Sequence, residues 1–321
     1  MQIKKRISVL IPTRDRRDVL QRVLEGLEKQ DCSRLVFEVI VVDDGSTDDT
    51  AEFLAGFARK TPLSFRYFLS RGESAGNARN IGIHNAQGDV ILFLDTDSIP
   101  APDVVRKHLQ LQNQFVDSMG CIVGQFTMAS ELVHSEQARL WEGDWQFYDQ
   151  DLVELNWWQY RTPNTSVKRA LCQQIGGFDK NLYPVEDTEL AHRLSKLGVR
   201  FYFDNSIVTT HYHPMTLQTY LKKGKMTGLA VARWYLREPK LRIFMSHRYG
   251  VFIPEMALGK KIKYLLRTLL INRATMPVMV TFARAIRGRW FRISNILYKN
   301  AYGYYTRRAF REYLSAAHLR N

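Results

Sequence analysis

The chain has 321 residues, of which 45% are hydrophobic and 24% charged, and its formal net charge at pH 7 is +14. This composition is too apolar for a disordered protein, and the length allows one large α/β domain with an appendage. Cys32, Cys121 and Cys172 lack C-x-x-C spacing, so neither a disulfide framework nor a structural zinc site is indicated, and a reduced, cytoplasmic compartment is favoured. We expect neither a signal peptide nor a spanning helix, because the sequence shows no signal-peptide core and no long uncharged apolar window.

The charge is unevenly distributed along the chain. Residues 1–215 carry 24 Lys and Arg against 29 Asp and Glu, a net of −5. Residues 216–321 carry 22 Lys and Arg against three Glu, a net of +19. The sequence therefore predicts a near-neutral domain at 1–215 and a basic, aromatic and mainly helical extension at 216–321.

The first hundred residues alternate between short apolar runs and helical patterns. Such alternation with short turns predicts a parallel sheet with helices on both faces. Beyond it, Gly198 marks the end of another helical pattern. The predicted strands are 7–11, 37–42, 65–69, 90–94 and 201–208, and the predicted helices are 19–27, 47–58, 74–86 and 186–197.

Two pairs of aspartates follow predicted strands. Asp43 and Asp44 end the second strand, and Asp95 and Asp97 follow the fourth. In open α/β sheets ligands bind beyond the carboxyl ends of the strands. Residues i and i+2 of an extended segment point to the same side, so Asp95 and Asp97 can converge on one Mg²⁺ or Mn²⁺ ion. The alternative is that these aspartates only end strands and cap turns.

Five further segments agree, in their order and spacing, with the interpretation of Asp95 and Asp97 as a metal site. Together with Asp95-Thr96-Asp97, residues 7–215 resemble an inverting family 2 glycosyltransferase of the kind used in bacterial polysaccharide and glycan biosynthesis. The resemblance implies the GT-A fold, a Rossmann-like mixed α/β sheet flanked by helices, with a donor-nucleotide half at 1–100 and an acceptor half at 101–215. The other matching segments are Ser8-Val9-Leu10-Ile11-Pro12-Thr13-Arg14, Val41-Val42-Asp43-Asp44-Gly45-Ser46-Thr47-Asp48, Gly76-Asn77-Ala78-Arg79-Asn80, Gly176-Gly177-Phe178-Asp179 and Glu186-Asp187.

The resemblance also implies a nucleotide-sugar donor site. Pro12 and Thr13 would line the base and ribose site, and Asp44 would accept a hydrogen bond from a pyrimidine ring, which favours a UDP-sugar. Asp95 would lie near the ribose and the metal. Arg79 stands where a cation could meet the diphosphate, the alternative being an arginine on a helix surface.

A Mn²⁺ or Mg²⁺ ion is implied as the cofactor, with Asp97 as its ligand. The metal would offset the charge that develops on the leaving diphosphate. His211 is the preferred further ligand and His213 its alternative, because strand alternation places both imidazoles on one side. The competing interpretation is two ordinary surface histidines.

Asp187 is the predicted general base, which would deprotonate the acceptor hydroxyl. It stands at the start of a predicted helix, where the helix dipole also favours a carboxylate that serves only as a cap. Glu186 is expected to contact the acceptor, and the segment that begins at Asn164 to line the acceptor side. Sugar stacking and core packing are the alternatives for Trp141, Trp145, Trp157 and Trp158.

The basic extension interleaves cations with the apolar residues Leu265, Leu266, Leu269 and Leu270. This pattern predicts an amphipathic helix on an anionic membrane surface, and hence a peripheral protein on the inner face of the cell membrane with a lipid-linked glycan as acceptor. A solvated helical appendage is the alternative. Nucleic acid is disfavoured as a partner because no reader motif accompanies the charge.

Two other functions compete with glycosyl transfer. A nucleotidyltransferase would also use a nucleotide, a metal and an α/β sheet, but it would carry a glycine-rich basic loop near the first strand. This chain has Pro12-Thr13-Arg14-Asp15-Arg16 there. An inactive glycan- or lipid-binding protein of the same fold is disfavoured by the presence of both Asp97 and Asp187.

Overall fold

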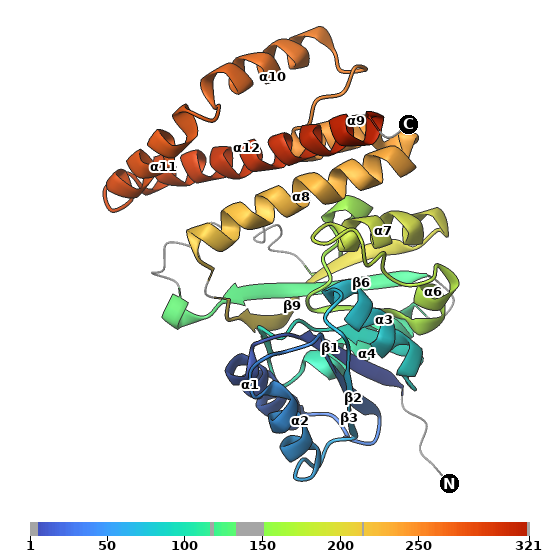
Figure 1. Ribbon diagram of the computed structural model, residues 1–321. Helices are drawn as coiled ribbons and strands as arrows, with labels where there is room; N and C mark the ends of the chain where they lie inside the picture. Colours follow the sequence, from blue (N-terminus) through green and yellow to red (C-terminus); the bar gives the residue numbers. More distant parts are fainter. Residues whose placement is uncertain (1–5, 116–118, 133–150, 214, 320–321) are drawn as a thin grey trace. The chain divides into compact units, whose positions relative to one another are not determined.

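The protein is represented by a computed structural model that describes residues 6–115, 119–132, 151–213 and 215–319. Trp141 and Trp145 lie outside these residues. The chain divides into two compact units (Figure 1). Unit 1 comprises Met1–Asn181 and Glu186–Pro214, and unit 2 comprises Leu182–Val185 and Met215–Asn321.

Unit 1 is built on a mixed sheet, which is nine-stranded within the described residues. The strand order is β3-β2-β1-β4-β8-β6-β9-β5, and β7 pairs with β9. The strands are β1 (Ile7–Thr13), β2 (Phe37–Asp43), β3 (Phe65–Leu69), β4 (Val90–Phe93), β5 (Ser98–Pro100), β6 (Gly120–Met128), β7 (Val153–Leu155), β8 (Thr165–Lys168) and β9 (Arg200–His211).

The four strands of the first hundred residues that precede Asp95 are mutually parallel, as predicted. β8 then pairs antiparallel with both β4 and β6, which makes the sheet mixed. β1 has neighbours on both sides, so its carboxyl end and those of β2 and β4 open at one edge of the sheet. This arrangement confirms the predicted mixed α/β fold.

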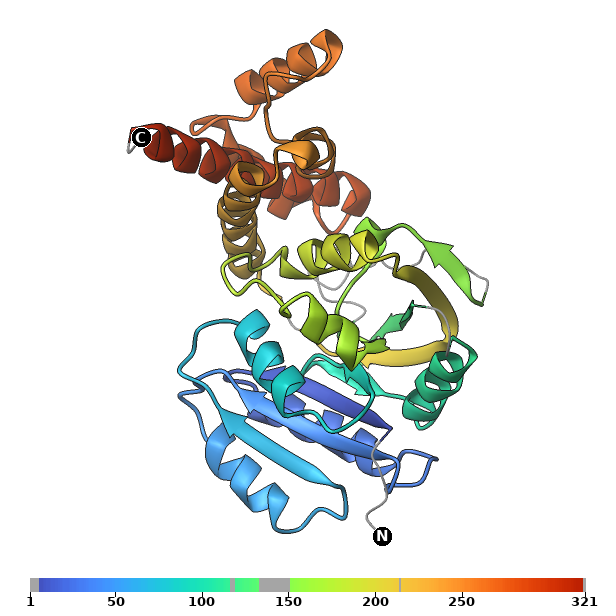
Figure 2. The same cartoon turned by 90° about the vertical axis from the view of Figure 1, so that its right-hand side faces the viewer.

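Helices flank the sheet on both faces (Figure 2). Alternate residues of β2 explain why, since Ile40 and Val42 join one hydrophobic core whereas Val39 and Val41 join the other. α1, α2 and α4 contribute apolar residues to the second core, and α3, α6 and α7 to the first. The bounds are α1 (Arg17–Glu28), α2 (Thr50–Ala58), α3 (Ala75–Asn85), α4 (Val104–Gln114), α6 (Arg169–Gln174) and α7 (Glu186–Lys196), with short helices η1 (Ser130–Leu132) and η2 (Trp157–Gln159).

Unit 2 is helical, which confirms the predicted helical extension. Its two long helices, α8 and α12, pack along each other (Figure 1). Gly228 allows the close approach, because a Cβ there would lie 2.2 Å from the carbonyl oxygen of Thr306. In the part of the chain that the structure describes, no helix is both long and apolar enough to cross a bilayer. The helices are α8 (Leu217–Arg237), η3 (Pro239–Leu241), α9 (Arg242–Tyr249), α10 (Leu258–Leu270), α11 (Thr275–Ile286) and α12 (Phe291–His318).

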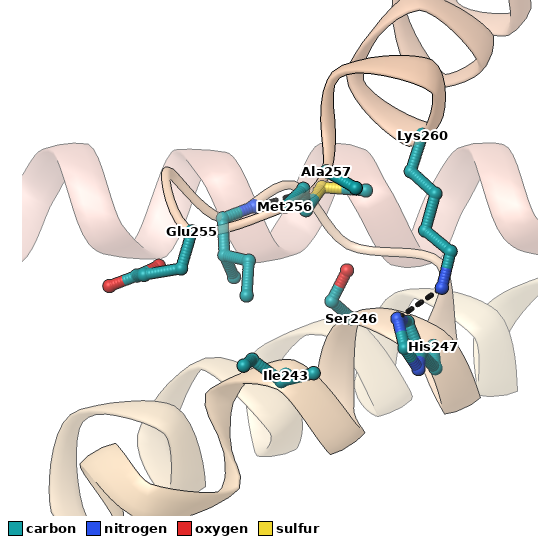
Figure 3. A pocket seen from close by; sticks show the side chains of 8 residues that line it. Ile243, Ser246, His247, Glu255, Met256, Ala257 and Lys260 are labelled. Atoms are coloured by element: carbon teal, nitrogen blue, oxygen red, sulfur yellow. Dashed lines mark hydrogen bonds between the residues drawn. The ribbon is translucent and has the colours of Figure 1, made fainter.

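A cavity of about 220 Å³ lies between α9 and the start of α10 (Figure 3). The side chains of Lys260 and His247 hydrogen-bond to each other at its wall. The other lining residues are Ile243, Ser246, Ile253, Glu255, Met256 and Ala257. With one carboxylate among eight residues, this cavity lacks the paired acids expected of a metal–diphosphate site.

Candidate active site

The ends of β1 and β2 are joined through Asp43 and Asp44. The backbone N–H of Asp44 donates to the carbonyl oxygen of Thr13 at 2.8 Å, and its carboxylate accepts from Ser70 Oγ at 3.1 Å. Asp43 accepts from the N–H of Ser46 at 2.9 Å and from its hydroxyl, so this residue caps the turn after β2. Both acids adjoin the end of β1, where Asp43 is in register with Thr13, but only the Asp43 carboxylate is used by its own turn.

The segment after β4 is attached to the same edge. Thr96 Oγ1 donates to the carbonyl oxygen of Pro12, and the N–H of Leu94 donates to the carbonyl oxygen of Leu10 at 3.0 Å. These bonds continue the parallel pairing of β1 with β4 beyond the strands themselves. The structure therefore brings the predicted donor residues Pro12, Thr13, Asp44 and Asp95 to one edge of the sheet.

Arg79 links this edge to the start of α7. Its guanidinium donates to Asp95 Oδ1 at 2.7 Å and to Glu186 Oε1 at 3.2 Å, and its side chain is buried. Burial alone would lower the pKa of Arg79, but the charges of Asp95 and Glu186 outweigh it and the pKa is raised. Arg79 is thus a buried cross-link between the donor and acceptor halves, not a helix-surface arginine.

The turn that precedes α7 is fixed against α3. The side chain of Asn80 donates to the carbonyl oxygen of Phe178 at 2.8 Å and accepts from its N–H at 2.7 Å. Gly177 has φ +71°, and a Cβ there would lie 2.2 Å from Asn80 Oδ1, so only glycine fits. Arg193 of α7 donates to the carbonyl oxygens of Ile175 and Gly177 at 2.6 and 2.7 Å. These contacts position the start of α7 beside Arg79.

Asp187 is the second residue of α7 and is half-buried. Its Oδ1 accepts from the N–H of Thr188 at 2.6 Å and from Thr188 Oγ1 at 3.2 Å. Its negative charge is among those that raise the pKa of Arg79. The helix-start position and an electrostatic effect on Arg79 are therefore both features of this one carboxylate.

Asp97 is the second acid of the Asp95-Thr96-Asp97 segment and has separate partners. Arg16 Nη1 lies 2.9 Å and His213 Nδ1 lies 2.8 Å from Asp97 Oδ2, whereas His211 Nε2 lies 3.4 Å from Oδ1. Oδ1 is buried and accepts no hydrogen bond in the described residues. Burial would raise the pKa of Asp97, but the imidazoles of His211 and His213 lower it well below its usual range.

The donor set around Asp97 suits a Mn²⁺ or Mg²⁺ ion. It combines one carboxylate oxygen without a hydrogen-bond donor with imidazole nitrogens, and burial lowers the pKa of His213, which favours the neutral form that binds metals. Within residues 6–115, 119–132, 151–213 and 215–319, no group of three or more His, Cys, Asp or Glu side chains is placed so that it could hold a metal ion. Arg16 Nη1 also lies 2.8 Å from His213 Nδ1, so a guanidinium faces the ligands.

Comparison with known proteins decides the family. A sequence model described as "Glycosyl transferase family 2" matches residues 8–176. The chain belongs to this family. The match includes the ends of β1, β2 and β4 described above, and it ends at Gly176, ten residues before the Glu186-Asp187 pair.

Two named relatives of this family-2 chain are 27% and 29% identical to it over the aligned residues. The uncharacterized glycosyltransferase YfnE of Bacillus subtilis is 29% identical over 257 residues, covering 64% of this chain and 65% of the relative. Validoxylamine A glucosyltransferase of Streptomyces hygroscopicus subsp. jinggangensis is 27% identical over 219 residues, covering 60% of this chain and 52% of the relative. The matches thus span between half and two thirds of these relatives.

Solved structures support the GT-A fold. Staphylococcus aureus TarS 1–349 in complex with UDP superimposes with a TM-score of 0.55 at 14% identity, covering 97% of this chain and 92% of that one. The mannosyltransferase PcManGT from Pyrobaculum calidifontis, in complex with GDP-Man and Mn²⁺, gives a TM-score of 0.60 at 17% identity over 93% of this chain and 85% of that one. At these identities the likeness concerns the fold alone.

Two predicted acceptor-side residues are internal in this family-2 structure. Asn164 is fully buried, with its amide nitrogen donating to the carbonyl oxygens of Gln125 and Ile207 at 3.1 and 2.9 Å and its oxygen 3.0 Å from His108 Nε2. It therefore supports the sheet and presents no exposed atom to an acceptor. Glu186 is likewise buried, with Arg79 as a partner.

The two described tryptophans differ in exposure. Trp157 packs against the core and contacts His192, with ring centroids 5.0 Å apart. Trp158 is exposed and meets Trp157 edge to face. Core packing therefore accounts for Trp157, and sugar stacking stays a prediction for Trp158.

Sequence reasoning missed Arg16 and Arg193. Arg16 was noted only as part of the charged run after the first strand, and its partner Asp97 lies 81 positions away. Arg193 stands four residues after Glu189, an ion-pair spacing visible in the sequence. That spacing signals a helix-surface pair and does not reveal the two backbone carbonyls that Arg193 also binds.

Proposed function

We propose that the protein is an inverting glycosyltransferase that uses a nucleotide-diphosphate sugar, with a UDP-sugar favoured. The acceptor would be a hydroxyl of a glycan or a lipid-linked glycan. The observation that carries the proposal is the buried Arg79 bridge, since it ties the donor-side Asp95 to the Glu186-Asp187 pair in a family-2 chain. The UDP complex of TarS and the named glucosyltransferase relatives support the same class of reaction.

Asp187 would act as the general base. In an inverting transfer the acceptor hydroxyl attacks the anomeric carbon opposite the leaving diphosphate, and a carboxylate takes its proton during the attack. The bonds that Thr188 donates to Asp187 Oδ1 orient the carboxylate, because they use one oxygen and fix the plane of the group. Asp187 would therefore receive the proton as the new glycosidic bond forms.

Asp44, Pro12 and Thr13 would hold the donor nucleotide. The carboxylate of Asp44 is buried at the sheet edge, where it could accept a hydrogen bond from a pyrimidine N–H. The Ser70 hydroxyl keeps that carboxylate in place.

Asp97 and His211, with His213 as the alternative, would hold the Mn²⁺ or Mg²⁺ ion. When bound, the metal supplies a Lewis acid that stabilises the charge on the leaving diphosphate. The contact of Arg16 with Asp97 and His213 means that this side chain must move or share the carboxylate for the ion to bind. The Mn²⁺ complex of PcManGT supports metal use in this fold.

A donor screen tests the proposal. The full chain is incubated with UDP- and GDP-sugars, Mn²⁺ and a glycan acceptor, and release of nucleoside diphosphate is measured. We expect turnover with a UDP-sugar and, by NMR, a product whose anomeric configuration is opposite to that of the donor. A product with the donor's configuration would refute the inverting mechanism. Release of pyrophosphate in a separate incubation with UTP and a sugar 1-phosphate would favour nucleotidyl transfer instead.

A further inference from the structure

The exposed apolar face of α10 is the feature that the proposed function leaves unexplained. At about 3.6 residues per turn, Leu258, Ile262, Leu265 and Leu269 fall on one face of the helix. Leu258 and Leu269 are 73% and 75% exposed. Tyr264, away from this stripe, is buried, and its ring centroid lies 5.3 Å from that of Phe252 of the same unit, with the two rings tilted. The helix is thus attached through Tyr264, and its leucines point outward.

The next two helices of the chain, α11 and α12, pack on each other, and Ala283 is the buried residue of α11. Large apolar side chains remain exposed there. They are Val278, Phe282, Trp290, Ile293 and Ile296.

Cations border this apolar face. Lys261 falls about 70° to one side of the middle of the α10 leucine stripe and Lys263 about 130° to the other. From the nearer position a lysine can hold its ammonium in water while its stem lies on lipid. Arg284 and Arg289 are exposed near the apolar residues of α11 and α12. Because residues 216–321 contain only three acids, this border is cationic throughout.

Arg267 of α10 and Arg307 of α12 are neighbouring cations. Arg307 Nη1 and Arg267 Nη2 would lie 3.0 and 3.7 Å from a Cβ on Gly303, so the two guanidiniums flank the same point. Arg307 is buried, its Nη2 donates no hydrogen bond within the described residues, and burial together with Arg267 lowers its pKa to about 10. The side chain of Arg267 donates to Asn300, a neutral group.

We propose that the α10 surface, defined by the leucine stripe and its bordering cations, docks on an anionic phospholipid bilayer. An apolar face between rows of cations is the pattern of a helix that lies in a membrane interface. Charge complementarity selects anionic lipid over a second copy of this chain, because two copies would bring like-charged borders together. Nucleic acid would satisfy the cations and leave the exposed leucines without a role.

Vesicle co-sedimentation of the full chain tests this surface. The chain is mixed, without donor or acceptor, with vesicles of phosphatidylcholine alone and of phosphatidylcholine with phosphatidylglycerol. We expect binding to the anionic vesicles only, and weaker binding at high salt. The double variant Leu265→Ser/Leu269→Ser should bind about tenfold less because it loses buried apolar area. The matched control is Leu35→Ser/Leu236→Ser, which removes exposed leucines elsewhere and should bind like the wild type.

Three results would overturn the proposal. If the chain does not bind anionic vesicles, the membrane is excluded as the partner. If the leucine variant binds as tightly as the wild type, the leucines do not contribute and only charge holds the chain on the vesicle. A dimer in sedimentation velocity that Leu265→Ser/Leu269→Ser converts to a monomer would assign the face to a second copy. Circular dichroism verifies that both variants fold. Turnover of a UDP-sugar with a soluble acceptor should be equal in all three proteins, so failure of docking and failure of the transferase proposal are separate results.

Discussion

Buried charged side chains have different neighbours in the two units. In unit 1 the buried cation Arg79 lies between Asp95 and Glu186, and the buried Asp97 lies among His211, His213 and Arg16. In unit 2 the buried Arg307 has Arg267 as its neighbour, and both are cations. Opposite charges balance one another in the buried site of unit 1, as in a preorganised polar site, whereas two like charges are neighbours in unit 2. We infer that chemistry resides in unit 1 and that unit 2 recruits the surface on which the acceptor is carried.

The largest effect is expected for the general base. Asp187→Asn keeps the shape and the acceptor oxygen toward Thr188 but cannot take a proton, so kcat should fall by about 10²–10⁴-fold. The control is Asp18→Asn, a highly exposed acid on α1. Vesicle binding by Asp187→Asn should equal that of the wild type, which separates chemistry from docking. Unchanged kcat would remove Asp187 from the mechanism.

Loss of the buried cross-link should destabilise unit 1. Arg79→Met leaves the buried Glu186 carboxylate without its cation, so the free energy of unfolding should fall by about 3–5 kcal/mol. The control, Arg106→Met, removes an exposed arginine that binds Asp31, and a much smaller change is expected. Urea unfolding followed by circular dichroism measures both. Equal losses in the two variants would mean that the Arg79 bridge is no stronger than a surface pair.

The buried imidazole of His108 should make unit 1 sensitive to acid. Burial lowers the pKa of His108 to about 4, and its ring nitrogens contact Ser166 and Asn164. The stability that this neutral imidazole contributes is complete above pH 6.5, the ordinary pKa, and is lost as the pH falls toward 4. The free energy of unfolding should fall by about 3 kcal/mol, because between these pH values His108 binds a proton in the unfolded chain and not in the folded chain.

Urea unfolding between pH 7 and pH 4 measures this dependence. His108→Gln removes the titrating group, so its unfolding free energy should fall less steeply over the same range. Parallel pH profiles for the two proteins would show that other groups cause the acid sensitivity.

The smallest effect concerns Arg16. Its guanidinium competes for Asp97 and His213, and it is partly exposed, so Arg16→Gln should tighten Mn²⁺ binding by about fivefold, the equivalent of a pair worth about 1 kcal/mol. Electron paramagnetic resonance of free Mn²⁺ measures the affinity without donor or turnover. Arg14→Gln, in the same loop, is the control. Weaker binding in Arg16→Gln would instead make Arg16 a support for the metal ligands.

Local pattern was sufficient to predict most of the fold. The apolar run at 65–69 becomes β3 with the same bounds, and the helical spacing around Leu190 becomes α7 with one residue fewer than expected. The leucine spacing of α10 also appears in the structure as an amphipathic helix. In each case the signal lies within one element, where periodicity reports burial directly.

The contacts between distant segments could not be predicted in this way. Arg79 and Glu186 are 107 positions apart, and their bond depends on how α3 and the turn at Gly177 meet. Asn164 was assigned to the acceptor side by its segment, yet its amide is used by β6 and β9. The sequence shows which residue type follows a predicted strand. Which partner its side chain contacts depends on how the neighbouring helices and strands pack, and that is not visible in the local pattern.

The central claim is that Asp97 belongs to a metal-dependent transfer site, and one measurement tests it most directly. Release of UDP from a turned-over UDP-sugar is followed for the wild type and for Asp97→Ala, each with Mn²⁺ and with EDTA. We predict that EDTA abolishes release by the wild type, that Mn²⁺ restores it, and that Asp97→Ala is slower by about 10³-fold even with Mn²⁺. Release that survives both EDTA and Asp97→Ala would contradict the account.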